Sequence, residues 1–302
     1  MRLVVAVGGN ALLERGDIPE AEIQVLHALD AVRALAPLAA DHELVVTHGN
    51  GPQVGLLAIE STRDPDLTHP FPLDVLGAQT QGMIGYFFLQ AFENALPGRE
   101  VASLICQTVV SPDDKAFRDP TKFVGSVYTE AEARRLADKF GWAVRPDGPH
   151  WRRVVPSPEP HEIVEMATVR RLLDGGALVI CEGGGGIPVV RGEHGQLRGT
   201  EAVIDKDLTA SLLARDLDAD SLVLLTDVAE VVSGYGTEHA RPIGRVTTTE
   251  LRAGQFPAGT MGPKVDAACR FVEATDRIAR IGRLSDAPDV LAGRRGTEIV
   301  PG

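Results

Sequence analysis

Short apolar runs alternate along the chain with longer segments in which apolar residues recur at helical spacing. Residues 2 to 7 form an apolar run that ends at Gly8, and residues 19 to about 40 carry apolar residues three or four positions apart. The further runs "ELVVTH", "LIC" with its flanking residues, "ALVIC" and "SLVLLT" lead into polar or glycine-rich loops. This alternation predicts an α/β fold with a mainly parallel sheet covered on both faces. Any ligand is then expected beyond the carboxyl ends of the strands.

Residues 113 to 155 interrupt this alternation. The polar segment "DDKAFRDPTKFVGS" leads into "TEAE", which is a helix capping box, and "WAVRPDGPHWRRVV" predicts a hairpin around a Pro-Asp-Gly turn. The segment therefore predicts a small subdomain that projects from the sheet. Residues 189 to 202 and 230 to 246 predict two further hairpins.

Composition narrows the class of ligand. The chain has 302 residues, 44% of them hydrophobic, and a net charge of −12, which disfavours nucleic acid and anionic membrane surfaces as partners. No apolar stretch approaches the roughly 20 residues that span a bilayer, and the first residues lack the features of a signal peptide. Cys106, Cys181 and Cys269 are odd in number and far apart, which predicts reduced, mostly buried thiols. We expect a cytoplasmic protein that binds a small molecule.

Lysine is scarce in this chain, and its placement is informative. Only five of the 30 basic residues are lysines: Lys115, Lys122, Lys139, Lys206 and Lys264. Lys206 and Lys264 stand where helices are expected to begin, although a helix N-terminus favours anions. A lysine in such a place suits a compact positive charge on a bound phosphate.

Four predicted strand ends carry glycine or an acid: "GGN" at 8 to 10, "HGNGPQ" at 48 to 53, "EGGGG" at 182 to 186 and "TDV" at 226 to 228. Glycines let backbone N–H groups approach an anion closely, and helix N-termini add a favourable dipole. Each motif alone is typical of a simple turn, and His48 is typical of a hydrogen-bonding loop residue. Four such ends at one edge of a sheet indicate an anion site.

Two readings of "AVIDKD" remain open at this point. In the first, an aspartate caps the following helix and the neighbouring charges are incidental. In the second, Lys206 neutralises a phosphoryl group during transfer while Asp207 orients the cationic side chains. Several other classes are disfavoured because their motifs are missing from the sequence: the dinucleotide fingerprint, the P-loop, the zinc-binding His-Glu pattern and the serine hydrolase elbow.

With these residues assembled, the sequence resembles the carbamate kinase family within the wider amino-acid kinase fold. The resemblance covers nearly the whole chain, through "VVAVGGNALL", "VVTHGNGPQVG", "AFRDPTKFVG", "RRVVPSPEPHEIVE", "CEGGGGIPVV", "GTEAVIDKDLTASLLA", "LLTDV" and "GTMGPKV". It implies a three-layer αβα sandwich, usually a homodimer, that transfers a phosphoryl group between carbamoyl phosphate and ADP with Mg²⁺, giving ATP and carbamate. It also implies an N-terminal lobe, residues 1–220, that binds carbamoyl phosphate, and a C-terminal lobe, residues 221–302, that binds the nucleotide.

The resemblance also assigns roles to individual residues. The cradle for carbamoyl phosphate would comprise Gly8, Gly9, Asn10, Gly49, Asn50 and Gly51. Lys122 would reach in from the projecting subdomain, and Lys206 and Lys264 would neutralise the transferred group while Asp207 holds them. The residues near the nucleotide would be Lys206, Thr226, Asp227, Met261 and Lys264.

The chain departs from the family pattern at two places. Phe123 follows Lys122 where a proline is usual, and "AEVVSGYG" follows "TDV" where a Val-Tyr pair is common. Two alternatives stay open: a kinase of the same fold for another carboxylate or phosphate acceptor, and a regulator that binds nucleotide without turnover. An ATP-forming assay with several phosphoryl donors distinguishes them.

Overall fold

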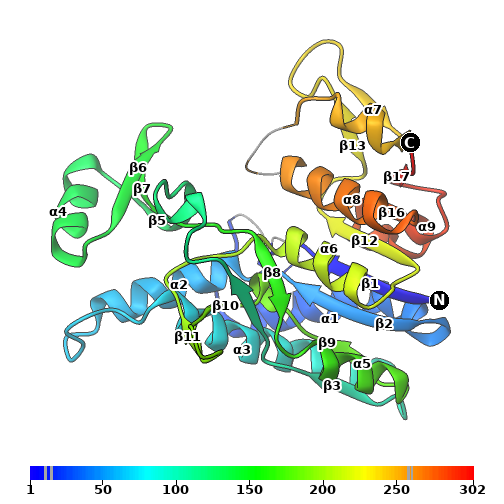
Figure 1. The fold of residues 1–302 in the computed structure, drawn as a ribbon, viewed down its shortest axis with the longest axis horizontal. Helices are drawn as coiled ribbons and strands as arrows, with labels where there is room; N and C mark the ends of the chain where they lie inside the picture. Colours follow the sequence, from blue (N-terminus) through cyan, green and yellow to red (C-terminus); the bar gives the residue numbers. More distant parts are fainter. Residues whose placement is uncertain (10–11, 14–15, 257–258, 260) are drawn as a thin grey trace.

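A large, mainly parallel sheet forms the centre of the molecule (Figure 1). The computed structural model describes residues 1–302 except 10–11, 14–15, 257–258 and 260. Within that part, eight strands lie in the order β15, β17, β16, β12, β1, β2, β9, β3, and only β16 and β17 pair antiparallel. The strands are β1 (Arg2–Val7), β2 (Glu43–His48), β3 (Val101–Ser103), β9 (Leu178–Ile180), β12 (Ser221–Thr226), β15 (Arg245–Thr247), β16 (Ile278–Arg283) and β17 (Thr297–Val300).

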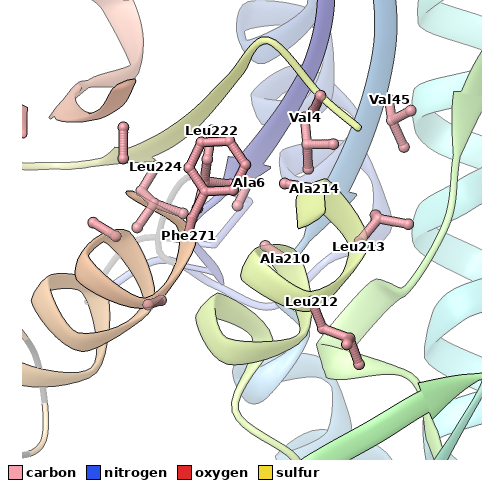
Figure 2. Close-up of a cluster of buried hydrophobic side chains, with 14 of the residues drawn as sticks. Val4, Ala6, Val45, Ala210, Leu212, Leu213, Ala214, Leu222, Leu224 and Phe271 are labelled. Atoms are coloured by element: carbon pink, nitrogen blue, oxygen red, sulfur yellow. The ribbon is translucent and has the colours of Figure 1, made fainter. Parts of the chain in front are cut away.

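Helices cover both faces of this sheet, because the central strands are apolar on both sides. Successive residues of a strand point to opposite faces, so Val4 belongs to one core while Leu3 and Val5 belong to the other. One face carries α5 (Met166–Asp174), α6 (Lys206–Asp216) and α8 (Met261–Thr275), and the other carries α1 (Ala21–Asp41), α3 (Leu73–Ala95) and α9 (Ala287–Leu291). Figure 2 shows the first core, in which strand residues meet Ala210 and Leu213 of α6 and Phe271 of α8. The expected three-layer αβα sandwich is confirmed.

Helix α1 is long and apolar enough to cross a membrane by length and composition alone. The expectation from the sequence that no apolar stretch is nearly long enough to cross a bilayer was therefore too strict. The buried face of α1, which includes Ala28, Val32 and Leu35, packs in the second core beside strand residues such as Leu3. This packing explains its apolar composition, because a helix beside a large sheet buries one full stripe.

The predicted insertion is a three-stranded antiparallel sheet with one helix (Figure 1, left). Its elements are β5 (Lys122–Tyr128), α4 (Glu130–Phe140), β6 (Ala143–Asp147) and β7 (His150–Val155). The predicted capping box is present at Thr129, and Gly141 ends α4 in the left-handed conformation, φ 70°. Arg153 of β7 bonds to Glu201, whose other carboxylate oxygen accepts from the backbone N–H of Leu73 at 2.8 Å. This link ties the projecting sheet to the start of α3.

A second, four-stranded sheet connects the central sheet with the projecting sheet. It has the order β11, β10, β4, β8, and a separate hairpin joins β13 to β14, so both predicted hairpins are confirmed. The predicted strand around "LIC" is confirmed only for its flanking residues, which form β3 and β4; residues 104–106 cross between these two strands, and Gln81 accepts the Cys106 N–H. The remaining elements are β4 (Gln107–Val110), β8 (Pro160–Ile163), β10 (Ile187–Arg191), β11 (Leu197–Gly199), β13 (Val231–Ser233), β14 (Arg241–Ile243), α2 (Gly51–Arg63), α7 (Thr248–Arg252) and the short 3₁₀ turns η2 (Lys115–Phe117), η3 (Gly183–Gly185) and η4 (Leu284–Asp286).

Candidate active site

Four neighbouring strands end at one edge of the central sheet, and each carries one of the predicted loops. The strands β12, β1, β2 and β9 are adjacent and parallel, so the loops that follow them meet. The backbone N–H of Gly8 donates to the carbonyl of Leu225 at 3.0 Å, and that of Gly49 donates to Val7 at 2.9 Å. The edge therefore gathers the segments predicted to bind an anion.

The glycines at this edge are required by close backbone packing. A Cβ on Gly49 would lie 2.5 Å from the backbone nitrogen of Gly9, a distance that real Cβ atoms do not show. Gly184 has φ 69°, and a Cβ there would run into the side-chain amide of Asn50. The loops after β1, β2 and β9 thus interlock, and backbone groups line the space between them.

An aspartate lies between two lysines at the starts of α6 and α8. Lys206 Nζ is 2.6 Å from Asp207 Oδ1, and Lys264 Nζ is 2.9 Å from Asp207 Oδ2. The side chains are only 13%, 13% and 5% exposed for Lys206, Lys264 and Asp207. The two ammonium groups come from helices that are adjacent in space but separated by about 60 residues of chain, and one carboxylate holds both.

Burial and neighbouring charges shift the pKa values of this cluster in opposite directions. Burial lowers the pKa of Lys206, although Asp207 partly offsets this effect. Burial alone would raise the pKa of Asp207, but the Lys206 and Lys264 ammonium groups lower it to about 2. The aspartate is therefore ionised at neutral pH and pairs with both lysine side chains.

Lys122 reaches the same region from the first residue of β5. Its Nζ lies 3.3 Å from Asp205 Oδ2 and 3.3 Å from the carbonyl of Ile204. Asp205 also caps α6, because its Oδ1 accepts from the Asp207 N–H at 3.0 Å. Both readings of "AVIDKD" are thus compatible with the structure: one aspartate caps the helix, and the residues beside it form a charged cluster. The structure brings Lys122, Lys206, Asp207 and Lys264 together around residues 204–207.

A cavity of about 490 Å³ opens beside this cluster, between α2, α3 and β5. Asn50, Gly51 and Lys122 line it together with Gly184 and Gly186, while the rest of its wall is largely apolar. Asn50 is fixed in place, because its Nδ2 donates to Thr80 Oγ1 of α3 at 2.9 Å. Gly8 and Gly9 do not line the cavity and lie deeper, against the loops after β12 and β2.

Of the residues predicted near the nucleotide, Lys206 and Lys264 belong to the charged cluster, whereas Thr226, Asp227 and Met261 lie at the end of β12 and the start of α8. Thr226 ends β12, and its hydroxyl donates to Asp227 Oδ1 at 2.9 Å. Met261 is the first residue of α8, three positions before Lys264, and packs partly buried against the first core. Asn10 was predicted to join the cradle and lies outside the described residues.

His48 has a structural role, as its loop position indicated. Its ring is 1% exposed, stacks on Phe88 with ring centroids 5.9 Å apart, and contacts the carbonyl of Gly49 through Nδ1 at 3.1 Å. Burial lowers its pKa to about 4, so the ring is neutral at pH 7. A neutral imidazole held in this way supports the loop.

The sequence interpretation missed the polar residues that hold the 183–186 turn. Gln81 Nε2 donates to the Gly183 carbonyl at 3.0 Å, and the hydroxyls of Thr108 and Thr209 lie 3.1 and 3.0 Å from the Gly185 carbonyl. Glu182, which begins the turn, is fully buried. Gln81 and Thr108 stand in no motif and are far away in the sequence, so only the fold reveals them.

Comparisons with known proteins agree with this geometry. A sequence model of the amino acid kinase family matches residues 1–282. Carbamate kinase from Rhizobium meliloti is 50% identical over 99% of this chain and 93% of its own length, and the one from Haemophilus influenzae is 46% identical over 99% and 96%. The structure of carbamate kinase from Giardia lamblia bound to AMP-PNP superposes with a TM-score of 0.92 at 40% identity, covering 99% of this chain and 98% of that one. The chain therefore belongs to the amino acid kinase family and, within it, to the carbamate kinases.

Proposed function

We propose that this site catalyses reversible phosphoryl transfer between carbamoyl phosphate and ADP, giving carbamate and ATP. The observation that carries the proposal is the Lys206–Asp207–Lys264 cluster, which lies at the edge where the interlocked glycine loops end. Buried ammonium groups beside closely packed glycine loops suit a phosphoryl group better than they suit an uncharged ligand.

The reaction breaks the bond between phosphorus and the carbamoyl oxygen and forms a bond from phosphorus to a β-phosphate oxygen of ADP. Negative charge spreads over the equatorial phosphoryl oxygens in the transition state. Lys206 and Lys264 stabilise that charge, and Asp207 fixes both ammonium groups before the substrates arrive. The leaving carbamate is already an anion, so the step needs neither a general base nor a covalent intermediate.

Substrates would enter from opposite sides of this cluster. The cavity lined by Asn50, Gly51 and Lys122 suits the carbamoyl end, because the projecting sheet places the Lys122 side chain at its wall. Gly8, Gly9 and Gly49 would supply the backbone beside the phosphate, and Thr226, Asp227 and Met261 would lie beside the nucleotide. In this arrangement residues 1–220 bind carbamoyl phosphate and residues 221–302 bind ADP.

Mg²⁺ would bind mainly through the nucleotide phosphates, because it prefers oxygen ligands and usually takes only one or two protein carboxylates. Asp205 and Asp207 are each paired with lysine, whereas Asp227 is exposed and forms no ion pair within the described residues. Asp227 is thus the carboxylate in this group that is suited to the ion, which would shield the charge between ADP and the transferred group. A cytoplasmic homodimer is part of the same proposal.

The test is a coupled assay of ATP formation from carbamoyl phosphate, ADP and Mg²⁺. Turnover that is lost in Lys206→Ala supports the proposal, and no turnover by the purified protein would refute it. ATP formation from acetyl or another acyl phosphate, but not from carbamoyl phosphate, would favour a kinase for a different acceptor. ADP binding without transfer from any donor would favour a nucleotide-binding regulator.

A further inference from the structure

A buried carboxyl group lies beneath the glycine turn and takes no part in the proposed reaction. Glu182 follows β9 with φ 54°, and its side chain is fully buried. Its Oε2 is 2.8 Å from Thr108 Oγ1, while Oε1 has no hydrogen-bond partner among the described residues. The described ion pairs include none with Glu182. An ionised carboxylate in this place would have no positive partner.

A second carboxyl group lies close to the first. Oxygens of Glu165 and Glu182 and the Cys106 sulfur all lie within 4.8 Å of one another. Glu165 accepts from the Gln107 backbone N–H at 2.7 Å and from Gln107 Nε2 at 3.0 Å, so two N–H donors stabilise its charge. Glu165 is partly exposed whereas Glu182 is fully buried, so a second negative charge beside Glu165 is disfavoured at Glu182. The donors assign the negative charge to Glu165 and the proton to Glu182.

Thr108 gives an independent indication of the same proton. Its hydroxyl lies 2.8 Å from Glu182 Oε2 and 3.1 Å from the Gly185 carbonyl. A carbonyl can only accept, and a hydroxyl carries a single hydrogen. If Thr108 donates to Gly185, the hydrogen in its contact with Glu182 must come from the carboxyl group. Only a protonated Glu182 allows both contacts to be full hydrogen bonds.

We propose that Glu182 is a positioning residue held as a neutral carboxylic acid, whose O–H donates to Thr108 so that Thr108 in turn holds the Gly185 carbonyl. The turn fixed in this way lies between Asn50 of the cradle and the backbone of Ile204, two residues before Lys206. Glu182 thus aligns the substrate loop with the charged cluster. Its effect on turnover rests on the proposed phosphoryl transfer, whereas its protonation does not.

Burial favours the neutral form of Glu182. It raises the pKa of this group to about 7, with Glu165 adding to the effect, although contacts with Thr108 and Cys106 lower the pKa in part. The Cys106 thiol is kept neutral, because its contact with Cys181 and its burial raise its pKa. Two further side chains pack against the turn and bring no positive charge to it. His48 at the end of β2 is neutral at pH 7, and Gln81 of α3 carries an uncharged amide.

Helix α6 also packs against the turn, and it carries Lys206 and Asp207, which are paired with each other. Raising the pH through about 7 therefore ionises a carboxyl group that no nearby cation compensates. Thr108 must then donate to Glu182, which leaves the Gly185 carbonyl with only the Thr209 hydroxyl at 3.0 Å, so the turn is held less firmly and turnover falls.

The first experiment compares the pH dependence of kcat/KM for ATP formation in the wild type, Glu182→Gln and Glu165→Gln. Glutamine keeps the shape of Glu182 and a donor for Thr108 but cannot ionise. We expect a step near pH 7 in the wild type, a step at lower pH in Glu165→Gln because the charge that adds to the pKa of Glu182 is removed, and no such step in Glu182→Gln. Lys206 is unchanged in all three proteins, so its contribution to the pH profile is common to them. A step that persists in Glu182→Gln, or that disappears only in Glu165→Gln, would overturn the proposal.

Two measurements do not depend on turnover. Infrared spectra of the wild type should show a protonated-carboxyl band at neutral pH that fades as the pH rises through about 7, and its absence would overturn the proposal. Glu182 has a folded pKa above its ordinary value of 4.5, so its stability contribution is full below about pH 4.5 and is lost by about pH 7. The Tm of Glu182→Gln relative to the wild type should therefore rise across that window.

A Tm difference that stays flat across this window would contradict the proposal. Elemental analysis provides one further check, because a stoichiometric metal ion beside Glu165 and Glu182 would replace the proton and overturn it. If the protein transfers no phosphoryl group but the band and the Tm trend are present, the proposed function fails and the protonation of Glu182 stands.

Discussion

Two buried acidic groups near the active-site edge carry opposite charge states. Asp207 lies 2.6 and 2.9 Å from two ammonium groups, which bring its pKa to about 2 despite its burial. Glu182 is buried as deeply but faces a hydroxyl, a thiol and another carboxyl group, and burial raises its pKa to about 7. Burial acts in the same direction on both groups. The partners that the fold brings to each side chain decide whether it is ionised.

Removing the negative charge at Asp207 should have the largest effect. In Asp207→Asn the two buried ammonium groups lose their shared partner, and we expect a loss of about 3–5 kcal/mol of unfolding free energy, the scale for breaking a buried pair. Turnover should fall by at least about 10²-fold. Urea denaturation and the ATP-formation assay measure the two effects.

The matched control for this change is Asp30→Asn, which breaks an ion pair with Arg33 whose side chains are 67% and 75% exposed. Exposed pairs of this kind contribute about 0–1 kcal/mol. Equal stabilities for Asp207→Asn and Asp30→Asn would mean that the buried pairs do not hold the cluster together.

The positive side of the cluster can be tested next. Lys206→Ala and Lys264→Ala should each lower kcat by roughly 10²-fold or more, because each removes one electrostatic stabiliser of the transferred group. Lys139→Ala is the control, since Lys139 is exposed near the end of α4. Near-normal kcat in either cluster variant would refute the role assigned to that lysine.

Lys122 should affect one substrate more than the other. It contacts Asp205 from the projecting sheet and lines the cavity beside Asn50. Lys122→Ala should raise the KM for carbamoyl phosphate by roughly tenfold, the scale for one charge-assisted hydrogen bond, with a smaller change for ADP. Equal changes in both KM values would count against a location on the carbamoyl phosphate side.

The smallest expected effect is a difference in acid stability. The folded pKa of Asp207 is depressed from 3.8 to about 2, so its stability contribution is present above about pH 3.8 and is lost as the pH falls through about 2. The Tm difference between the wild type and Asp207→Asn should therefore shrink over that window. Glu182→Gln should show the opposite trend with pH, and parallel trends would contradict the comparison.

Local patterns in the sequence were sufficient for much of this molecule. The apolar runs predicted the central strands, and the capping box at Thr129 and the turn at residues 146–148 predicted the projecting sheet. Lysines at two helix starts pointed to the charged cluster, because a cation is unfavourable there without an anion. Each of these signals depends on residues that are close together in the chain, so a single sequence is enough to detect it.

Contacts across long stretches of chain could not be predicted in this way. Thr108, Glu165 and Glu182 belong to three segments that only the fold brings together. The residues of "LIC" have a strand-like composition, but they cross between two sheets because β3 and β4 belong to different ones. Helix α1 has the length and apolar composition of a membrane-spanning helix, because composition alone does not show that it packs against the central sheet.

The central place of β1 has a consequence for the synthesis of the chain. β1 leaves the ribosome long before β12, which is one of its two neighbours and in which Ser221 pairs with Leu3. β1 can pair early with β2, but both cores need β12 as well, so the nascent chain holds one unpaired edge of β1 until about residue 226 has emerged. Delayed pairing of this kind slows folding and leaves a strand edge open to other chains. A pause in translation before β12 would therefore lengthen the period in which this protein can aggregate.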